Sequence, residues 1–206
     1  MKTLKVACIA GLALLLSCSK GTMLRKYYVL EPQRFFSLND FGITESLPFK
    51  TDVREFIVAK PFAQTRIASR SASHEMNYFQ YHHWATRPTA SVTYMVYRLI
   101  ENSGLFTRTS YGFSADADYI ITGDIHKLEL IEEKKGMSAH LGITFRLIRN
   151  ETETVEARYD FDRTVELEER TMNQFAWIVS ELIREETQNF LRNVVDYFEA
   201  GGELGQ

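Results

Sequence analysis

The chain has 206 residues, of which 45% are hydrophobic and only four are proline, and its formal net charge is −3 at pH 7. This length and apolar content suit one globular domain with a sizeable core and no long linker. The acidic balance argues against a nucleic-acid-binding protein, which needs a basic surface.

The first 17 residues have the pattern of a bacterial export signal. Lys2 and Lys5 form a positively charged start, and an apolar run follows over residues 6–16. A run of this length suits the hydrophobic part of a signal peptide, whereas a transmembrane helix needs roughly 20 apolar residues. We therefore expect residues 1–17 to be a cleaved signal peptide.

The end of this segment reads Leu-Leu-Ser-Cys at residues 15–18 and resembles a lipobox. Leu15 is the aliphatic residue three positions before the cysteine, and the small Ser17 gives a peptidase access to the bond that is cut. The Cys18 thiol would then accept a diacylglyceryl group and become the lipid attachment site. An ordinary secretory signal with an incidental Cys18 is the alternative interpretation.

Cleavage would leave a mature chain without a free thiol, because Cys8 departs with the signal and Cys18 is alkylated. No cysteine is then available for a disulfide, a thiolate metal site or a nucleophile. We expect no cofactor other than the covalent lipid. Loss of the two lysines also lowers the formal net charge from −3 to −5.

Residues 18–26 are predicted to be the lipidated cysteine and a short polar tether. The eight residues after Cys18, fully extended at about 3.3 Å each, reach roughly 26 Å, so the domain must lie close to its membrane. Ser19 directly follows the cysteine, and in enterobacterial-type sorting a serine there lets a lipoprotein travel to the outer membrane. We therefore predict an outer-membrane protein that faces the periplasm and is held by its acyl chains.

The domain itself is expected over residues 27–200. Its first part predicts an irregular stretch at 35–50 and four strands, the last two forming a hairpin, at residues 27–30, 53–59, 66–70 and 76–81. A helix is then predicted from Pro88 to Asn102, with Gly104 as its end. Three residues on this helix fall at a spacing that faces the core, namely Val92, Val96 and Leu99.

Strands over residues 105–109 and 118–132 precede the clearest pattern, a long antiparallel hairpin. Apolar and polar residues alternate over 137–147 and again over 155–167, which is typical of strands with one buried face. His140 and Arg146 on the first strand are expected to pair with acids on the polar face of the second strand.

From Thr171 to about Glu199 the period becomes helical. The core-facing residues of this helix are Phe175, Ile178, Val179, Leu182, Phe190, Val194 and Phe198. Together these elements predict an α+β fold, a two-layer single domain with a mainly antiparallel sheet and two main helices on one face. Residues 201–206 are expected to be a disordered C-terminus.

The sequence contains no motif of a catalytic or metal site. Adjacent His82 and His83 point in different directions on a strand or helix, so they are poor ligands for one metal ion. Glu166, Glu168 and Glu169 are interpreted as solvated residues at a strand end. We therefore predict no metal site and no enzymatic activity.

Three aromatic residues are candidate partner contacts, because they lie near irregular segments, where binding residues concentrate. Phe35 and Phe36 begin the irregular stretch, and Trp84 lies just before the first helix. Core packing is the alternative for all three, and for Trp84 it is the stronger interpretation.

Several short motifs follow the lipobox in a fixed order, namely Tyr27–Leu30, a strand into Pro61, Arg66–Arg70, Tyr78, Trp84, Pro88, Ser103–Phe106 and Ala117–Gly123. In this order and spacing the sequence resembles the ABC-type transport auxiliary lipoproteins, the group that includes paraquat-inducible lipoprotein C. The resemblance spans nearly the whole mature chain.

This resemblance implies a non-enzymatic auxiliary or docking role in envelope lipid transport, with an MCE-type protein of an ABC transporter as partner. It also implies that some members assemble as homo-oligomeric rings. Two alternatives remain. One is an outer-membrane assembly lipoprotein that plugs or chaperones a β-barrel, as lipopolysaccharide-assembly lipoproteins do. The other is a lipid-anchored hydrolase, which would need a nucleophile beside a base.

Overall fold

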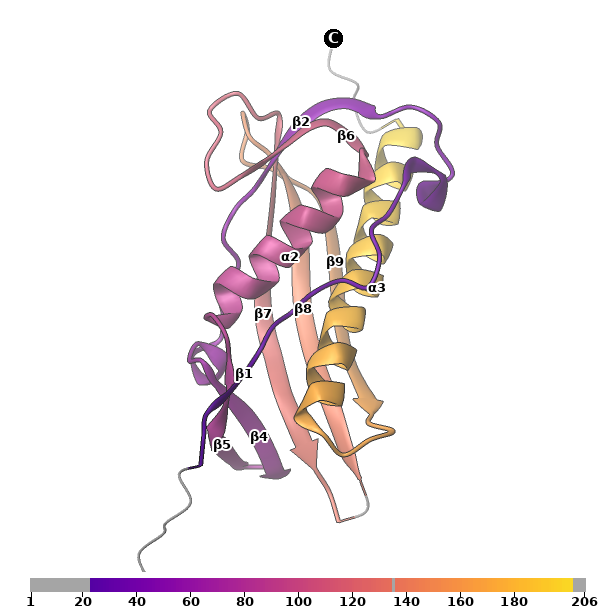
Figure 1. Cartoon of the computed structure of the whole chain (residues 1–206). Coiled ribbons are helices and arrows are strands. Elements are labelled where there is room, and N and C mark those ends of the chain that lie inside the picture. Colours follow the sequence, from indigo (N-terminus) through magenta and orange to yellow (C-terminus); the bar gives the residue numbers. More distant parts are fainter. Residues whose placement is uncertain (1–22, 135, 202–206) are drawn as a thin grey trace, which may run out of the picture.

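The centre of the fold is a three-stranded antiparallel ribbon of β7 (Tyr119–Glu132), β8 (Met137–Arg149) and β9 (Val155–Glu166) (Figure 1). Its β8–β9 part is the hairpin that the alternating pattern predicted. The computed structural model describes residues 23–134 and 136–201. The predicted signal peptide with its lipobox, Ser19 and the tail after residue 201 lie outside the described residues.

The other edge of β7 is lined by three short strands, one after another along its length. All three run parallel to it: β2 (Leu47–Val53), β3 (Ile57–Val58) and β4 (Arg66–Ala72). The outer strands complete a mixed sheet, with β6 (Phe106–Tyr111) parallel to β2, β5 (Glu75–Trp84) antiparallel to β4, and β1 (Lys26–Tyr28) parallel to β5. The expected β4–β5 hairpin is confirmed, while the parallel pairings were not predicted.

The single strand predicted over residues 53–59 is wrong, because the chain breaks between β2 and β3. Phe56 turns into the core there, and its backbone N–H donates to Thr93 Oγ1 at 2.9 Å. The Phe56 ring packs over Gly123, where an added Cβ would lie only 2.6 Å from ring atom Cε2. Only glycine leaves room for this ring, so the break in the strand depends on a residue far away in the sequence.

The stretch predicted as irregular contains a short 3₁₀ helix, η1 (Leu38–Phe41), before β2 begins. The Asp40 carboxylate accepts a hydrogen bond from the backbone N–H of Ser37 at 2.8 Å, and Gly42 ends the turn with a φ of 75°. A second 3₁₀ helix, η2 (Lys60–Phe62), follows β3 where the sequence places Pro61.

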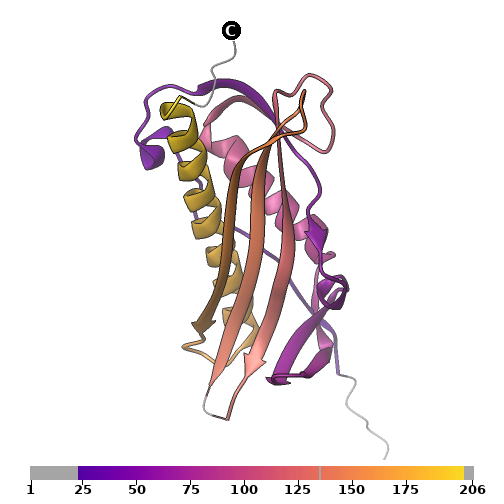
Figure 2. The same cartoon turned by 180° about the vertical axis from the view of Figure 1, so that it is seen from behind.

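Two helices cover one face of the sheet, as predicted: α2 (Pro88–Ser103) and α3 (Met172–Glu199). Gly104 ends α2 in the left-handed conformation, and the Thr171 side chain accepts the N–H of Gln174 at the start of α3. Every core-facing residue predicted on these helices is buried. Figure 2 shows the opposite face of β7, β8 and β9, which no helix covers.

The core lies between this sheet and the helices. Phe145 of β8 stacks on Phe190 of α3 with 5.1 Å between ring centroids, and Phe56 meets the same Phe145 ring edge-on. The α+β, two-layer, single-domain prediction is therefore confirmed. Within the described residues, neither helix is both long and apolar enough to span a membrane.

Candidate functional site

Of the three predicted contact residues, two belong to the core. Phe36 is buried and packs edge-on against Phe41, and Trp84 is buried against the ring of Phe175. Neither side chain is free to meet a partner in this structure, so their assignment as contacts is corrected. Phe35 is 42% exposed and stays a candidate.

Phe35 belongs to an exposed cluster, here called the tyrosine surface, which consists of Phe35, Tyr94, Tyr97, Arg98 and Tyr111. The ring centroids of Tyr97 and Tyr111 are 5.2 Å apart, and those of Tyr94 and Tyr111 are 5.8 Å apart. The Arg98 guanidinium lies 5.6 Å from the centre of the Phe35 ring and joins it to the cluster. Tyr94 and Tyr111 are about half exposed.

Polar contacts hold these rings in place. The Tyr97 hydroxyl donates to a Glu101 carboxylate oxygen at 2.5 Å, and this hydrogen bond, helped by burial, raises the pKa of Tyr97 to about 12. Arg98 lies 3.5 Å from the same carboxylate. The surface therefore presents hydroxyls and a guanidinium around flat rings. Tyrosine and arginine contribute much of the binding energy in protein interfaces, so the composition suits a protein partner.

The members of this surface that lie on α2 and β6 were not predicted from the sequence. The signal was present, because positions 94, 97, 98 and 101 repeat at the spacing of neighbours on one helix face. That face lies away from the buried stripe of α2. An aromatic stripe on the exposed side of a helix was the pattern to look for.

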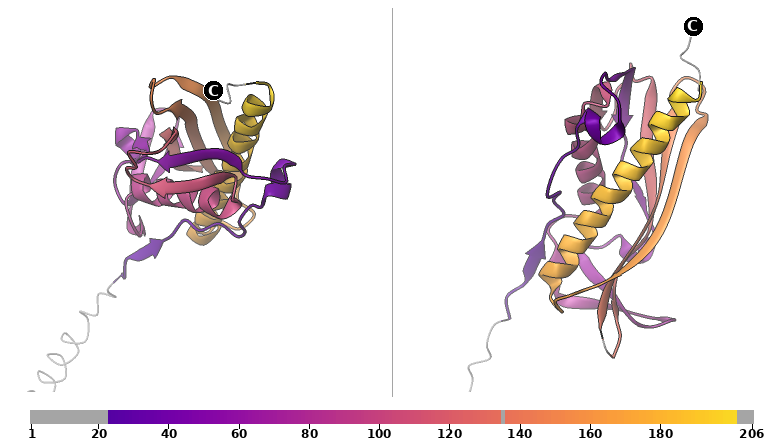
Figure 3. Two further views of the ribbon diagram at one scale, coloured as in Figure 1. Left: turned by 90° about the horizontal axis from the view of Figure 1, so that it is seen from above. Right: turned by 90° about the vertical axis from the view of Figure 1, so that its right-hand side faces the viewer.

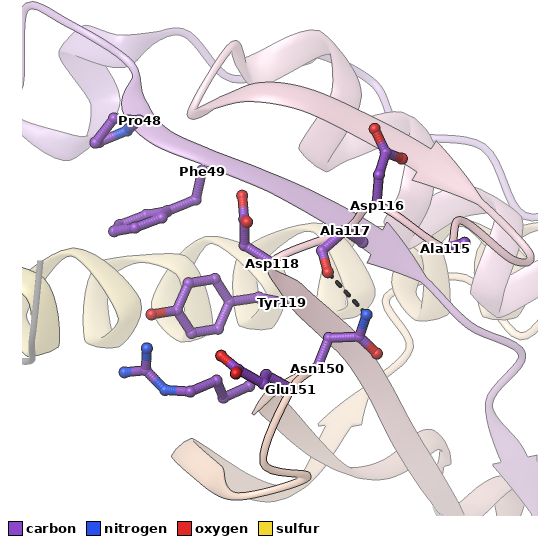
Figure 4. Close-up of a pocket in the computed structure, with 10 residues that line it drawn as sticks. Pro48, Phe49, Ala115, Asp116, Ala117, Asp118, Tyr119, Asn150 and Glu151 are labelled. Carbon is purple, nitrogen blue, oxygen red and sulfur yellow. Dashed lines mark hydrogen bonds between the residues drawn. The ribbon is translucent and has the colours of Figure 1, made fainter. Parts of the chain in front are cut away.

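A pocket of about 590 Å³ lies where β2, the loop before β7 and the β8–β9 turn meet (Figure 4). Phe49 and Tyr119 form an aromatic wall, with 5.1 Å between ring centroids. The amide of Asn150 donates to the carbonyl oxygen of Ala117 at 2.8 Å and ties the turn to the loop. The lining residues include no serine, cysteine or histidine, and the acids among them are Asp116, Asp118 and Glu151.

Several charged side chains at this pocket have partners within the protein. Arg149 donates to Glu156 at 2.7 Å, which raises the pKa of Arg149, and its guanidinium lies over the Tyr119 ring at 5.3 Å. Asp118 accepts the backbone N–H of Lys50 at 2.8 Å. Burial raises the pKa of Tyr119, whose hydroxyl has no hydrogen-bond partner among the described residues. These contacts stabilise the junction of three segments, and they provide no acid–base pair.

A third feature is a chain of charged side chains across the uncovered face of the sheet. Arg70 of β4 lies 2.9 Å from the fully buried Glu129 of β7. His140 of β8 has one ring nitrogen 3.2 Å from Glu129 and the other 2.7 Å from Asp162 of β9. The chain therefore links four strands through direct ionic contacts.

The predicted cross-strand pairing of His140 with an acid on β9 is confirmed by its contact with Asp162. The pairing predicted for Arg146 is wrong. Arg146 stands opposite Arg158 of β9 in the register, so like charges would meet there, and it binds Asp124 of β7 instead. The sequence predicted the pairing of β8 with β9 but not its pairing with β7, so the acids of β7 were not considered as partners.

The two adjacent histidines contact different partners within the protein. His82 Nδ1 lies 2.8 Å from the Tyr28 hydroxyl, and His83 Nε2 lies 3.1 Å from the carbonyl oxygen of Gln80. The part of the chain that the structure describes contains no group of three or more side chains suited to hold a metal ion.

A family model described as "ABC-type transport auxiliary lipoprotein component" matches residues 44–189, more than half of the chain. This chain belongs to that family. The resemblance seen in the sequence is thereby confirmed, and the protein is an auxiliary lipoprotein of ABC-type transport, a class associated with the cell envelope membranes. The family description names no catalytic activity, and the absence of enzymatic activity stays a prediction.

Two solved structures show the same fold as this auxiliary lipoprotein. One is a Xanthomonas campestris protein assigned to the DUF330 family, with a TM-score of 0.67 and 14% identity, covering 87% of this chain and 97% of that one. The other is described only as an uncharacterized protein, with a TM-score of 0.65 and 10% identity, covering 83% of this chain and 99% of that one. At such identities the likeness concerns the fold alone. No curated protein matches the chain in sequence.

The family region includes α2 and β6, which carry most of the tyrosine surface, whereas Phe35 and β1 precede it. The candidate functional site of this auxiliary lipoprotein is therefore an exposed surface on the family domain.

Proposed function

We propose that this auxiliary lipoprotein is a non-enzymatic docking component of an ABC/MCE-type system for lipid transport. In this proposal a lipid on Cys18 anchors it in the outer membrane, and the domain faces the periplasm. The observation that carries the proposal is the tyrosine surface, an exposed aromatic and arginine cluster on the domain of a transport-auxiliary family.

The position of this surface supports a docking role. The described chain begins at Met23 beside β1, at one end of the molecule, while β6 and the second half of α2 lie towards the other end (Figure 1). A lipid on Cys18 would hold the first end close to the membrane. The tyrosine surface would then be turned towards proteins in the periplasm.

The tether explains why a second protein is needed. Residues 18–22 are the part of the predicted tether that precedes the described chain, and fully extended they span about 17 Å. A domain held so close to the outer membrane cannot itself reach the inner membrane. The MCE-type protein would bridge this distance, with the tyrosine surface as its binding site.

Capture of the partner tests the proposal. The purified MCE-type protein from the same organism would be passed over the lipidated protein, with Tyr94→Ala/Tyr111→Ala as the variant and Thr164→Ala on the uncovered sheet face as the control. We expect the double variant to bind at least tenfold more weakly, about 1.4 kcal/mol, and the control to bind normally. Equal capture by the wild type, the double variant and the control would show that the tyrosine surface is not the binding site.

Ring assembly of several copies is a further part of the proposal. Mass photometry of the lipidated protein in detergent would test it, since a ring gives one discrete mass at a multiple of the protomer mass. A monomer at all concentrations would contradict it.

A further inference from the structure

Large apolar side chains are exposed where the described chain begins. Met23 is 68% exposed, Leu24 79%, Tyr27 59% and Val29 55%, and Trp177 beside them is 46% exposed. We call these five residues the tether-side patch. Contiguous exposed apolar residues of this kind mark interaction sites on soluble domains.

The fold brings the residues around β1 and Trp177 of α3 together in this patch. Trp177 lies in the first half of α3, and with Tyr27 and Val29 it lines a groove of about 450 Å³. The backbone N–H of Glu31 donates to Ser180 Oγ at 3.2 Å, which fixes the segment after β1 against the helix. Figure 3 shows β1 beside the start of α3, close to where the chain enters the domain. Trp177 is therefore held in place next to the tether.

The surroundings of Trp177 differ on its two sides. On the β1 side its neighbours in the groove include Lys26, Tyr27 and Val29, with Glu31 as the one acid in the lining. On the β9 side, two further hollows are lined by Val165, by Arg163 and by four acids, namely Glu166, Glu168, Glu181 and Glu185. An apolar or membrane surface would meet only the β1 side, because the acids keep the other side in water.

We propose that the tether-side patch inserts into the headgroup region of the membrane that holds the lipid anchor, with Trp177 and Tyr27 as the interfacial residues. Tryptophan and tyrosine prefer this region because they combine an apolar ring with a polar group. Arg25 and Lys26 stand beside them and suit lipid phosphates. The inference rests on the proposed anchor at Cys18.

The length of the tether favours a membrane over other occupants. Residues 18–22 span at most about 17 Å, so a lipidated Cys18 keeps Met23 within that distance of the bilayer at all times. Burial in the bilayer would be driven by apolar area and would depend little on anionic lipid, since the acids beside Trp177 offset the two basic residues. The patch would thus set which side of the domain faces the membrane.

Fluorescence quenching tests this contact, because the chain has two tryptophans in opposite environments. Trp84 is buried in the core and Trp177 is exposed. Full-length lipidated protein would be placed in phosphatidylcholine vesicles that contain a lipid brominated near the headgroups. We expect the quenched fraction to be several-fold larger for the wild type than for Trp177→Phe, in which only Trp84 emits.

A matched control places a tryptophan at the other end of the molecule. Phe113 is 79% exposed in the loop between β6 and β7, and Phe113→Trp in the Trp177→Phe background should not be quenched. Quenching there instead of at position 177 would overturn the proposed orientation.

Vesicle flotation in the same samples separates this inference from the proposed anchor. Protein that floats without quenching at Trp177 would refute the membrane contact and leave the anchor intact, whereas protein that fails to float would refute the anchor. If Trp177 emission instead shifts to the blue with protein concentration in vesicle-free detergent, a second copy covers the patch and the membrane proposal is wrong.

Discussion

The two exposed aromatic surfaces of this protein differ in their chemistry. In the tyrosine surface, rings are accompanied by polar groups, as Tyr97 donates to Glu101 and Arg98 lies over Phe35. In the tether-side patch the exposed residues are mostly plain apolar side chains beside the chain entry. Directional polar contacts give specificity for a protein, whereas an apolar patch with interfacial aromatics suits a lipid surface. One small domain can therefore present separate surfaces to a partner and a membrane.

The largest effect is expected from removal of the anchor, on which the comparison depends. Cys18→Ala removes the acceptor thiol, so the precursor should stay uncleaved and carry no lipid. Mass spectrometry of the protein from membranes would measure both. Normal cleavage in this variant would contradict the lipoprotein interpretation and leave the tether-side patch without a membrane to meet.

Moving the anchor to another membrane should separate the roles of the two surfaces. Ser19→Asp should fold and be lipidated normally, yet fractionate with the inner membrane under enterobacterial-type sorting. The tether-side patch would still lie beside a bilayer. The tyrosine surface, however, would face the periplasm from the inner membrane instead of from the outer membrane. We expect this variant not to restore the envelope permeability of a deletion strain. Full complementation from a proven inner-membrane location would rule out the docking role.

Phe35 and Phe36 are neighbours in the sequence, but Phe35 is exposed and Phe36 is buried in the core. Phe36→Ala should lower the free energy of unfolding by about 3–5 kcal/mol, because it leaves a cavity in a packed core. Phe35→Ala should change it by less than about 0.5 kcal/mol, as for an exposed residue, while it weakens capture of the MCE-type partner. Chemical denaturation and the capture assay measure the two effects. A large loss of stability in Phe35→Ala would assign that residue to the core.

The smallest effect concerns the chain of charged side chains that links β4 to the central ribbon, which we call the seam. Hydrogen bonds to Glu129 and, less strongly, to Asp162 raise the pKa of His140 above its usual value. Burial acts to raise the pKa of Glu129, but hydrogen bonds from His140 and Arg70 outweigh burial and hold it below its usual value. Both shifts therefore favour the charged form of each group in the folded protein.

The sign of the pH effect follows from these shifts. The contribution of His140 is fully present below its unfolded pKa of about 6.5 and is lost as the pH rises through the higher folded pKa. The contribution of Glu129 is present above its unfolded pKa and is lost as the pH falls through the lower folded pKa. The thermal midpoint should thus fall by a few degrees from near-neutral to alkaline pH, and His140→Gln should flatten this decline. An unchanged slope in that variant would show that the seam does not depend on the histidine.

The sequence predicted the parts of the fold that depend on local pattern. The β8–β9 hairpin and both helices follow from alternation, helical spacing and residues such as Pro88 and Gly104. The break between β2 and β3 could not be predicted, because it depends on Phe56 packing over Gly123, a contact between distant segments. The parallel strands along β7 are likewise set by long-range pairing, which a single sequence does not encode as a period.

The candidate site was only partly predictable for the same reason. Phe35 and Phe36 are adjacent in the sequence and equally aromatic, and only the tertiary structure shows that one is exposed and the other buried. The tyrosine surface combines residues of α2, β6 and the segment before η1, so its members meet only after folding. The predicted lipobox differs, because a motif of this kind is short and contiguous and acts before the chain folds.

Site-specific photo-crosslinking in cells tests the central claim most directly. A photoreactive residue would replace Tyr94 or Trp177 in the full-length, lipidated protein. We predict that the residue at position 94 crosslinks to an MCE-type protein of an ABC transport system, and that the residue at position 177 gives no protein adduct and instead labels lipid. Crosslinking of position 94 to a β-barrel assembly protein, or of position 177 to the transport partner, would contradict the account.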